Sequence, residues 1–84
     1  MLRIKIGTID MYGATGRDLH PKATDSGRTG IVQMYETEMW DGDGDEVPSI
    51  EVGIYTVKLD DNAIDVRVVE IMSYEVASIE LIKQ

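Results

Sequence analysis

The N-terminal residues alternate between apolar and charged side chains with the period of two that is typical of a β-strand. Apolar residues occupy one face and basic residues the other: Leu2, Ile4 and Ile6 against Arg3 and Lys5. The apolar positions then change parity across Gly7, and Ile9 and Met11 follow it. This pattern predicts a strand that bulges or bends at the glycine.

Two more stretches show strand patterns. Residues 29–39 predict a strand whose faces carry Ile31 with Tyr35, and Val32 with Met34. Residues 50–59 predict another, in which the apolar set Ile50, Val52 and Ile54 gives way, past Gly53, to Tyr55, Val57 and Leu59. A parity switch at a glycine suits the bending of a curved sheet.

The C-terminal third of the chain predicts two short strands. Asp60, Asp61 and Asn62 indicate a hairpin turn, and residues 63–69 then alternate apolar and polar positions. Residues 70–76 have no clear period, and we expect a single helical turn there. Residues 77–82 predict the last strand.

Residues 12–30 contain several glycines, together with Pro21, and no periodic apolar pattern, so they predict a long loop. Loops of this length in small domains are commonly functional or face a partner. We expect Arg17 and Arg28 to structure this loop by pairing with nearby Asp residues. His20 is expected to hydrogen-bond the backbone or pack on the rim of the fold.

The loop ends in a polar turn with the sequence Asp25-Ser26-Gly27-Arg28-Thr29-Gly30-Ile31-Val32. Gly27 and Gly30 can adopt a positive φ without a Cβ clash, and Asp25 or Ser26 can hydrogen-bond nearby backbone amides. The turn therefore predicts a strand that begins at about Thr29.

This turn, of the form G-x-x-G-x-V, resembles the glycine turn of small SH3-like barrels, including the KOW-type modules. Residues 55–61 and 78–82 also look like barrel strands of that class. The resemblance implies an all-β fold: a small SH3-like barrel of about five strands, with a long first loop and one short helical turn. Such barrels bind RNA, DNA, peptides or other subunits, so the fold alone selects no function.

The composition indicates one domain, residues 1–84, and excludes several classes of protein. Cysteine is absent, which excludes a disulfide framework and a thiolate metal site. The N-terminus alternates and does not form a continuous apolar segment, so we expect neither a signal peptide nor a membrane span. These features favour a cytoplasmic protein.

The formal net charge of −8 is distributed unevenly. The first part of the chain, to residue 35, is mildly basic, whereas residues 36–51 carry seven acids and no base. A field of this sign repels phosphate backbones and attracts basic partners. We therefore expect a non-enzymatic interaction module that docks a basic protein surface through an acidic segment. The candidate docking residues are Glu36, Glu38, Trp40, Asp41, Asp43, Asp45 and Glu46.

Candidate chemistry is weak elsewhere. The run from Asp41 to Asp45 invites a calcium hypothesis, but Glu46 and Val52 stand where an EF-hand loop needs a glycine and a bidentate glutamate. His20 is the only histidine, and the spacing ties no nucleophile to it. We expect no catalytic residues, no metal and no cofactor.

Two other functions stay open. A KOW-type nucleic-acid-binding barrel is supported by the glycine turn and opposed by the charge. A small subunit of a larger enzyme would keep its catalytic groups on the partner. Small acidic single-domain proteins also resemble inhibitors encoded by phages and mobile elements, some of which mimic the charge of nucleic acids.

Overall fold

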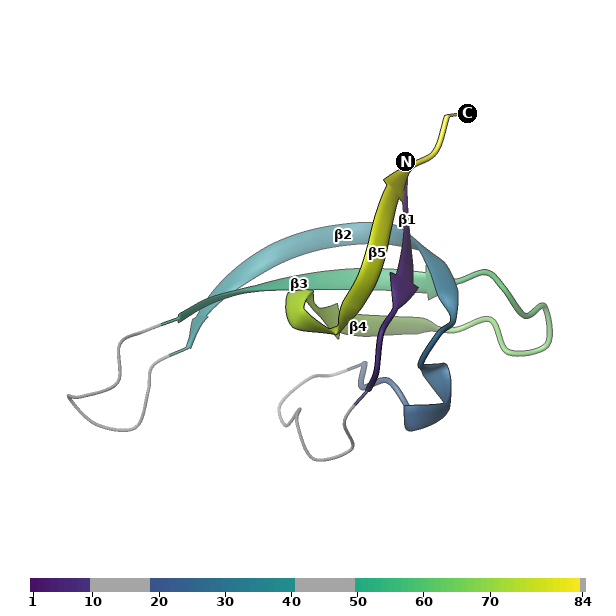
Figure 1. Cartoon of the computed structure of the whole chain (residues 1–84), viewed down its shortest axis with the longest axis horizontal. Helices are drawn as coiled ribbons and strands as arrows, with labels where there is room; N and C mark the ends of the chain where they lie inside the picture. Colours follow the sequence, from purple (N-terminus) through teal and green to yellow (C-terminus); the bar gives the residue numbers. More distant parts are fainter. Residues whose placement is uncertain (10–18, 41–49, 84) are drawn as a thin grey trace.

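The computed structural model describes residues 1–9, 19–40 and 50–83 of the chain. Their secondary structure consists of five strands and two short 3-10 turns (Figure 1). The strands are β1 (Leu2–Ile6), β2 (Thr29–Trp40), β3 (Ile50–Leu59), β4 (Val68–Met72) and β5 (Val76–Leu81). The turns are η1 (Ala23–Asp25), which precedes β2, and η2 (Ser73–Glu75), which joins β4 to β5.

All five strands belong to one antiparallel sheet with the order β4-β3-β2-β1-β5. The predicted all-β class, the long first connection and the helical turn before the last strand are confirmed. These five strands do not close into a barrel as far as the structure describes the chain. In the described residues β4 and β5 form the two edges of the sheet, because η2 takes the chain from β4 across to β5, which pairs with β1 on the far side.

The main core lies on one face of the sheet. Ile4 and Ile6 of β1 are completely buried, as the alternation of β1 predicts. Four buried residues of β3 and β4 share this cluster with Ile9: Val57, Leu59, Val69 and Ile71. The pairs Val57↔Val69 and Tyr55↔Ile71 place the β3 and β4 members of the cluster on this face.

A second, smaller cluster lies on the opposite face and consists of Val52, Ile54 and Met72. Ile54 is opposite Met72, one position along from the Tyr55↔Ile71 pair, so the two pairs face opposite sides of the sheet. The β3 ladder has no register shift at Gly53. The predicted parity switch is therefore wrong: β3 is apolar on both faces because each face meets a different cluster.

A real change of parity occurs in β2, where the register shifts between Val32 and Met34. Val32 is opposite Val57 and Tyr35 is opposite Tyr55, so Val32 and Tyr35 share the core face of the sheet. The prediction that Tyr35 shares a face with Ile31 is wrong, because simple alternation does not count the extra residue of a bulge.

Two predicted strands have different bounds. β1 ends at Ile6, because the amide of Gly7 donates to the carbonyl oxygen of Glu75 (2.6 Å) and leaves the ladder. The strand predicted over residues 63–69 lies instead at Val68–Met72. The segment before it is a turn in which the Ile64 amide donates to the Asn62 side chain (2.9 Å) and Ile64 is 96% exposed.

The two glycines of the polar turn have different structural roles. Gly27 has φ 84°, as the turn prediction requires, and β2 begins at Thr29 as expected. Gly30 does not have a positive φ, so that part of the prediction is wrong. Gly30 is needed for space: a Cβ there would lie 2.6 Å from the carbonyl oxygen of Lys58 and would also clash with Val57.

Candidate protein-docking site

The hairpin of β2 and β3 extends past its neighbours. β1 pairs with β2 only over Thr29–Ile31, and β4 pairs with β3 only over Ile54–Lys58. We call the extension the arm: residues 34–40 of β2 and 50–53 of β3. Figure 1 shows it leaving the rest of the sheet toward the left. The rest of the described structure is called the body.

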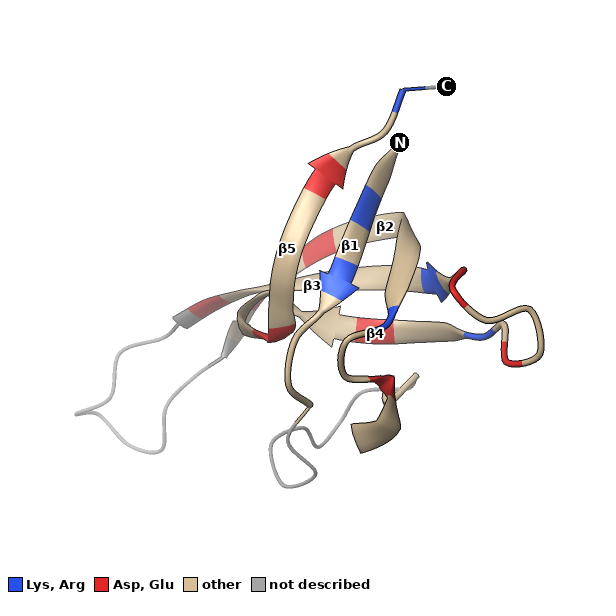
Figure 2. Ribbon diagram, turned by 45° about the vertical axis from the view of Figure 1, so that its right-hand side comes forward, with Lys and Arg blue, Asp and Glu red and all other residues tan. Residues whose placement is uncertain are grey.

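The two faces of the arm carry different side chains. Glu36 and Glu38 lie on one face, since they are opposite Ile54 and Val52, and both are exposed. Figure 2 shows acidic positions along β2. Tyr35 and Met39 lie on the other face and are 52% and 61% exposed. The arm therefore presents Met34, Glu36 and Glu38 on one face, and Tyr35, Met39 and the exposed Glu51, which is opposite Met39, on the other.

The Tyr35 ring packs against the ring of Tyr55, the residue opposite it on β3. Its centroid lies 4.7 Å from that of Tyr55, with the two rings tilted by 41°. A Cβ on Gly53 would approach the Tyr35 hydroxyl to 2.7 Å, so the ring lies directly over this glycine. The missing side chain at Gly53 lets the tyrosine lie flat on the sheet while half of it stays exposed.

The backbone of the arm has one free edge. The Leu59 amide donates to the carbonyl oxygen of Arg67. The N–H and C=O groups of Leu59, and of Val57 and Tyr55 two and four residues before it, therefore point toward β4. The intervening β3 residues face β2, and their partners there are Met34, Glu36 and Glu38. It follows that Tyr35, Thr37 and Met39 direct their N–H and C=O groups away from β3. In the described residues, no strand pairs with β2 on that side beyond Ile31.

The predicted docking residues are only partly described. The structure places Glu36 and Glu38 on the same face of the arm, and Trp40 is the last residue of β2. Four predicted members lie outside the described residues: Asp41, Asp43, Asp45 and Glu46. The calcium hypothesis concerned that same segment. In the described residues, no group of His, Asp and Glu could hold a metal ion.

The charged residues of the body form ion pairs. Asp25, at the end of η1, has no exposed surface, and its carboxylate accepts hydrogen bonds from Arg67 and from Arg28 (3.3 Å). Arg28 also donates to Asp61 and Asp65, each at 2.8 Å. We call these five residues the ion network. The network links the end of the long loop, at Asp25 and Arg28, to the connection between β3 and β4, which contains its other three members.

The network shifts the pKa values of its carboxyl groups downward. Burial raises the pKa of Asp25, but the hydrogen bonds from Arg67 and the Lys22 amide outweigh burial, so its pKa is lowered. For Asp61, burial is likewise outweighed by Arg28. Hydrogen bonding from Arg67 lowers the pKa of Asp65. All three are therefore stabilised as carboxylates.

Sequence reasoning predicted one half of this network. Arg28 was expected to pair with a nearby Asp, and Asp25 to bond a backbone amide, which it does at Lys22 N (2.8 Å). Arg67 was missed because its alternating neighbours suggested an exposed strand position. One of its two aspartate partners, Asp25, is 42 residues distant in the chain.

The other predicted loop residues contribute little to a site. The Nδ1 atom of His20 lies 2.6 Å from the carbonyl oxygen of Pro21, and the His20 side chain is exposed. Arg17 lies outside the described residues.

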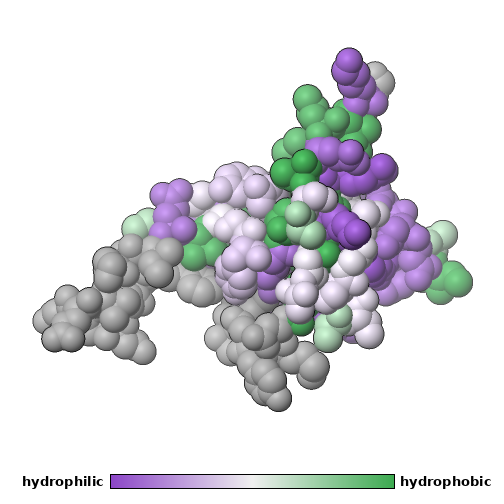
Figure 3. Space-filling view, in the orientation of Figure 1, coloured by the Kyte–Doolittle hydropathy of each residue, from purple (hydrophilic) through white to green (hydrophobic). Residues whose placement is uncertain are grey.

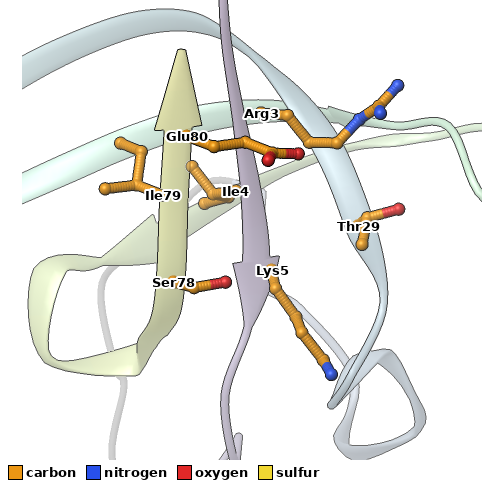
Figure 4. A pocket seen from close by; sticks show the side chains of 7 residues that line it. All are labelled: Arg3, Ile4, Lys5, Thr29, Ser78, Ile79 and Glu80. Atoms are coloured by element: carbon orange, nitrogen blue, oxygen red, sulfur yellow. The ribbon is translucent and has the colours of Figure 1, made fainter. Parts of the chain in front are cut away.

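A shallow pocket of about 420 Å³ lies over β1, β2 and β5, mainly on the face of the sheet opposite the main core (Figure 4). Lys5 and Ser78 are paired in register there, but the Lys5 side chain points away from Ser78. Arg3, at the pocket rim, is paired with Asp60 (3.1 Å). The lining shows no nucleophile next to a base, so the pocket suggests no catalytic chemistry.

An apolar patch lies beside the chain termini, where Figure 3 shows hydrophobic surface. It consists of Met1, Leu2, Ile79 and Leu81, of which Leu81 is the most exposed, at 73%. The patch continues the core face beyond Ile4, so it reflects the open end of the sheet.

Comparison with known proteins gives no relative. No family model matches the chain, and neither the curated proteins nor the solved structures contain a significant match. The described part of the chain has no helix long and apolar enough to cross a membrane.

Proposed function

We propose that this protein is a non-enzymatic interaction module that docks a positively charged protein surface through the arm and the acidic segment that follows it. One observation carries the proposal: the hairpin extends past the main core and exposes Glu36 and Glu38 on one face, and Tyr35, Met39 and Glu51 on the other. A two-stranded ribbon is marginally stable in water by itself. An extension that adds little core and exposes large apolar groups is typical of a binding surface.

The charge of the arm indicates the partner. Residues 36–51 carry seven acids and no base, and Glu36 and Glu38 lie side by side on one exposed face. Such a field accelerates encounter with a basic surface and repels an acidic one. A role as an inhibitor of a nucleic-acid-binding protein, or as a subunit of an enzyme, would be a narrower form of the same docking function.

The nucleic-acid alternative has less support. Arg28 and Arg67 are held by aspartates of the ion network, and Arg3 is paired with Asp60. Cations already engaged by carboxylates contribute little to phosphate binding. The acidic arm would oppose that binding further.

The proposal can be tested by nuclear magnetic resonance with deca-lysine as the probe and deca-glutamate as its control. We expect deca-lysine to shift amide signals of residues 34–40 and 50–53 at low salt, and deca-glutamate to shift none. Glu36→Gln should weaken deca-lysine binding roughly two- to fivefold, as expected for one exposed charge pair. Glu80→Gln, which removes an exposed acid of β5, should have a smaller effect. Shifts spread evenly over all acidic residues would overturn the proposal.

A further inference from the structure

We propose that the partner binds by strand addition: an extended segment with alternating basic and apolar residues pairs with the free edge of β2 along Tyr35, Thr37 and Met39. This inference rests on the proposed function and specifies how the arm holds its partner. Strand addition requires backbone hydrogen bonds between the partner and β2, in addition to attraction between charged side chains.

The edge offers a complete set of backbone groups. Tyr35, Thr37 and Met39 each present one N–H and one C=O on the side of β2 that faces away from β3. Free edges in native sheets are usually shortened, covered, or guarded by proline, by a bulge or by charged side chains, above all lysine. Residues 33–40 contain no lysine and no proline. In the part of the chain that the structure describes, no strand covers this edge, and its guards are the bulge before Met34 and the charges of Glu36 and Glu38, which a basic strand satisfies.

The side chains beside the edge define what the added strand must carry. Side chains of one strand alternate between faces, so half of the partner's residues would lie beside Glu36 and Glu38. Lysine or arginine fits there. The other half would lie beside Tyr35 and Met39, which are large, apolar and half exposed, so aliphatic residues fit on that face.

A second copy of this chain is a poor occupant of the same edge. Pairing two β2 edges would bring Glu36 and Glu38 of one copy next to the same residues of the other. Like charges on neighbouring strands destabilise a sheet. The glutamates thus oppose self-pairing while they admit a basic strand, and this makes the heterologous partner the better fit.

The test uses the full chain and the capped peptide Lys-Val-Lys-Val-Lys-Val-Lys in three forms: unmodified, N-methylated on every valine, and N-methylated on every lysine. In an antiparallel addition, the partner residues that bond Tyr35, Thr37 and Met39 share their face and are the valines. Valine methylation should then lower the affinity at least tenfold relative to lysine methylation. A parallel addition would give the reverse order, because the bonding residues would then be the lysines.

Hydrogen exchange at single amides supplies the second measurement. In the free protein the amides of Tyr35, Thr37 and Met39 should exchange faster than that of Glu36, which bonds β3. The unmodified peptide should slow the three edge amides at least tenfold. Thr37→Pro, which removes one edge donor, should weaken peptide binding at least tenfold relative to Thr37→Ala.

The outcomes separate this inference from the proposed function. Binding of the three peptides at the arm with equal affinity, without protection of the edge amides, would overturn strand addition and leave docking by charge intact. Failure of every peptide, and of deca-lysine, to bind the arm would overturn both. If Thr37→Pro does not fold, the pair of methylated peptides still decides the question.

Discussion

The body and the arm use charged residues in opposite ways. In the body, the carboxylates of Asp25, Asp61 and Asp65 each contact the guanidinium group of Arg28, of Arg67 or of both. In the arm, Glu36 and Glu38 are exposed acids in a segment of the chain that holds no base. Paired charges fix one conformation of a loop. A row of like charges opposes the stability of the strand that carries it and acts on what approaches from outside.

The main core belongs to the body, where Ile4, Val57 and Leu59 are fully buried. On the arm only Val52 is buried among the described hydrophobic side chains, whereas Tyr35 and Met39 leave half or more of their surface exposed. Burial in the body supplies the stability of the fold. The arm adds length to two strands and little to the core, so we expect substitutions in the two regions to separate stability from binding.

The largest effect is expected at Asp25. Asp25→Ala would remove the acceptor shared by Arg28 and Arg67 and leave both guanidinium groups partly buried without it. Loss of one partner of a buried pair costs about 3–5 kcal/mol, and remaining contacts with Asp61 and Asp65 favour the lower end. Urea denaturation measures the change in the free energy of unfolding.

Asp60→Asn is the matched control for this prediction. Asp60 pairs with Arg3 at 3.1 Å, and both side chains are partly exposed. An exposed pair of this kind contributes about 0–1 kcal/mol. Equal losses from the Asp25 and Asp60 variants would contradict the view that the ion network holds the loop.

The second effect compares the same substitution in the two regions. Gly30→Ala would place a methyl group 2.6 Å from the Lys58 carbonyl oxygen, and the backbone must move to accept it. Overpacking of this kind costs about 1–3 kcal/mol. Gly53→Ala meets the tip of the Tyr35 ring, which can swing toward solvent, so its loss in stability should be smaller. Thermal denaturation of the two variants tests the order, and equal melting temperatures would contradict it.

The third effect is the pH dependence of the body. The pKa values of Asp25, Asp61 and Asp65 are lower in the folded chain than the ordinary value near 3.9. Their contribution to stability is therefore complete above about pH 4 and is lost as the pH falls below it through the folded values. Unfolding measured from pH 6 to pH 2 should show this loss, and Asp25→Ala should make the decline shallower. Parallel declines would remove Asp25 as a cause.

Much of the fold could be predicted from the sequence because the signals are local. Alternation in β1 identifies its buried face, and the positive φ of Gly27 with the start of β2 at Thr29 follows from turn chemistry. The short turn η2 was also expected. Each of these features depends on residues within a few positions of each other.

The errors come from interactions between distant segments. The strand predicted over residues 63–69 failed because Arg67 turns toward Asp25, and this contact was invisible in the alternation around it. The face of the sheet on which Tyr35 lies depends on the bulge between Val32 and Met34, where the pairing of β2 with β3 shifts register. The acidic segment itself could be predicted from composition, whereas the free edge along Tyr35, Thr37 and Met39 required the strand order and register.

The smallest effect on stability is expected in the arm. Glu36→Gln together with Glu38→Gln removes two neighbouring like charges from an exposed face, so the free energy of unfolding should change by less than about 0.5 kcal/mol or rise slightly. The same variant should associate more slowly with deca-lysine, and the difference should shrink as salt rises, because screening shortens the range of the field. Stopped-flow fluorescence of Trp40, the only tryptophan in the chain, can follow the rate. A large loss of stability with an unchanged rate would assign these glutamates to the fold and remove the distinction between body and arm.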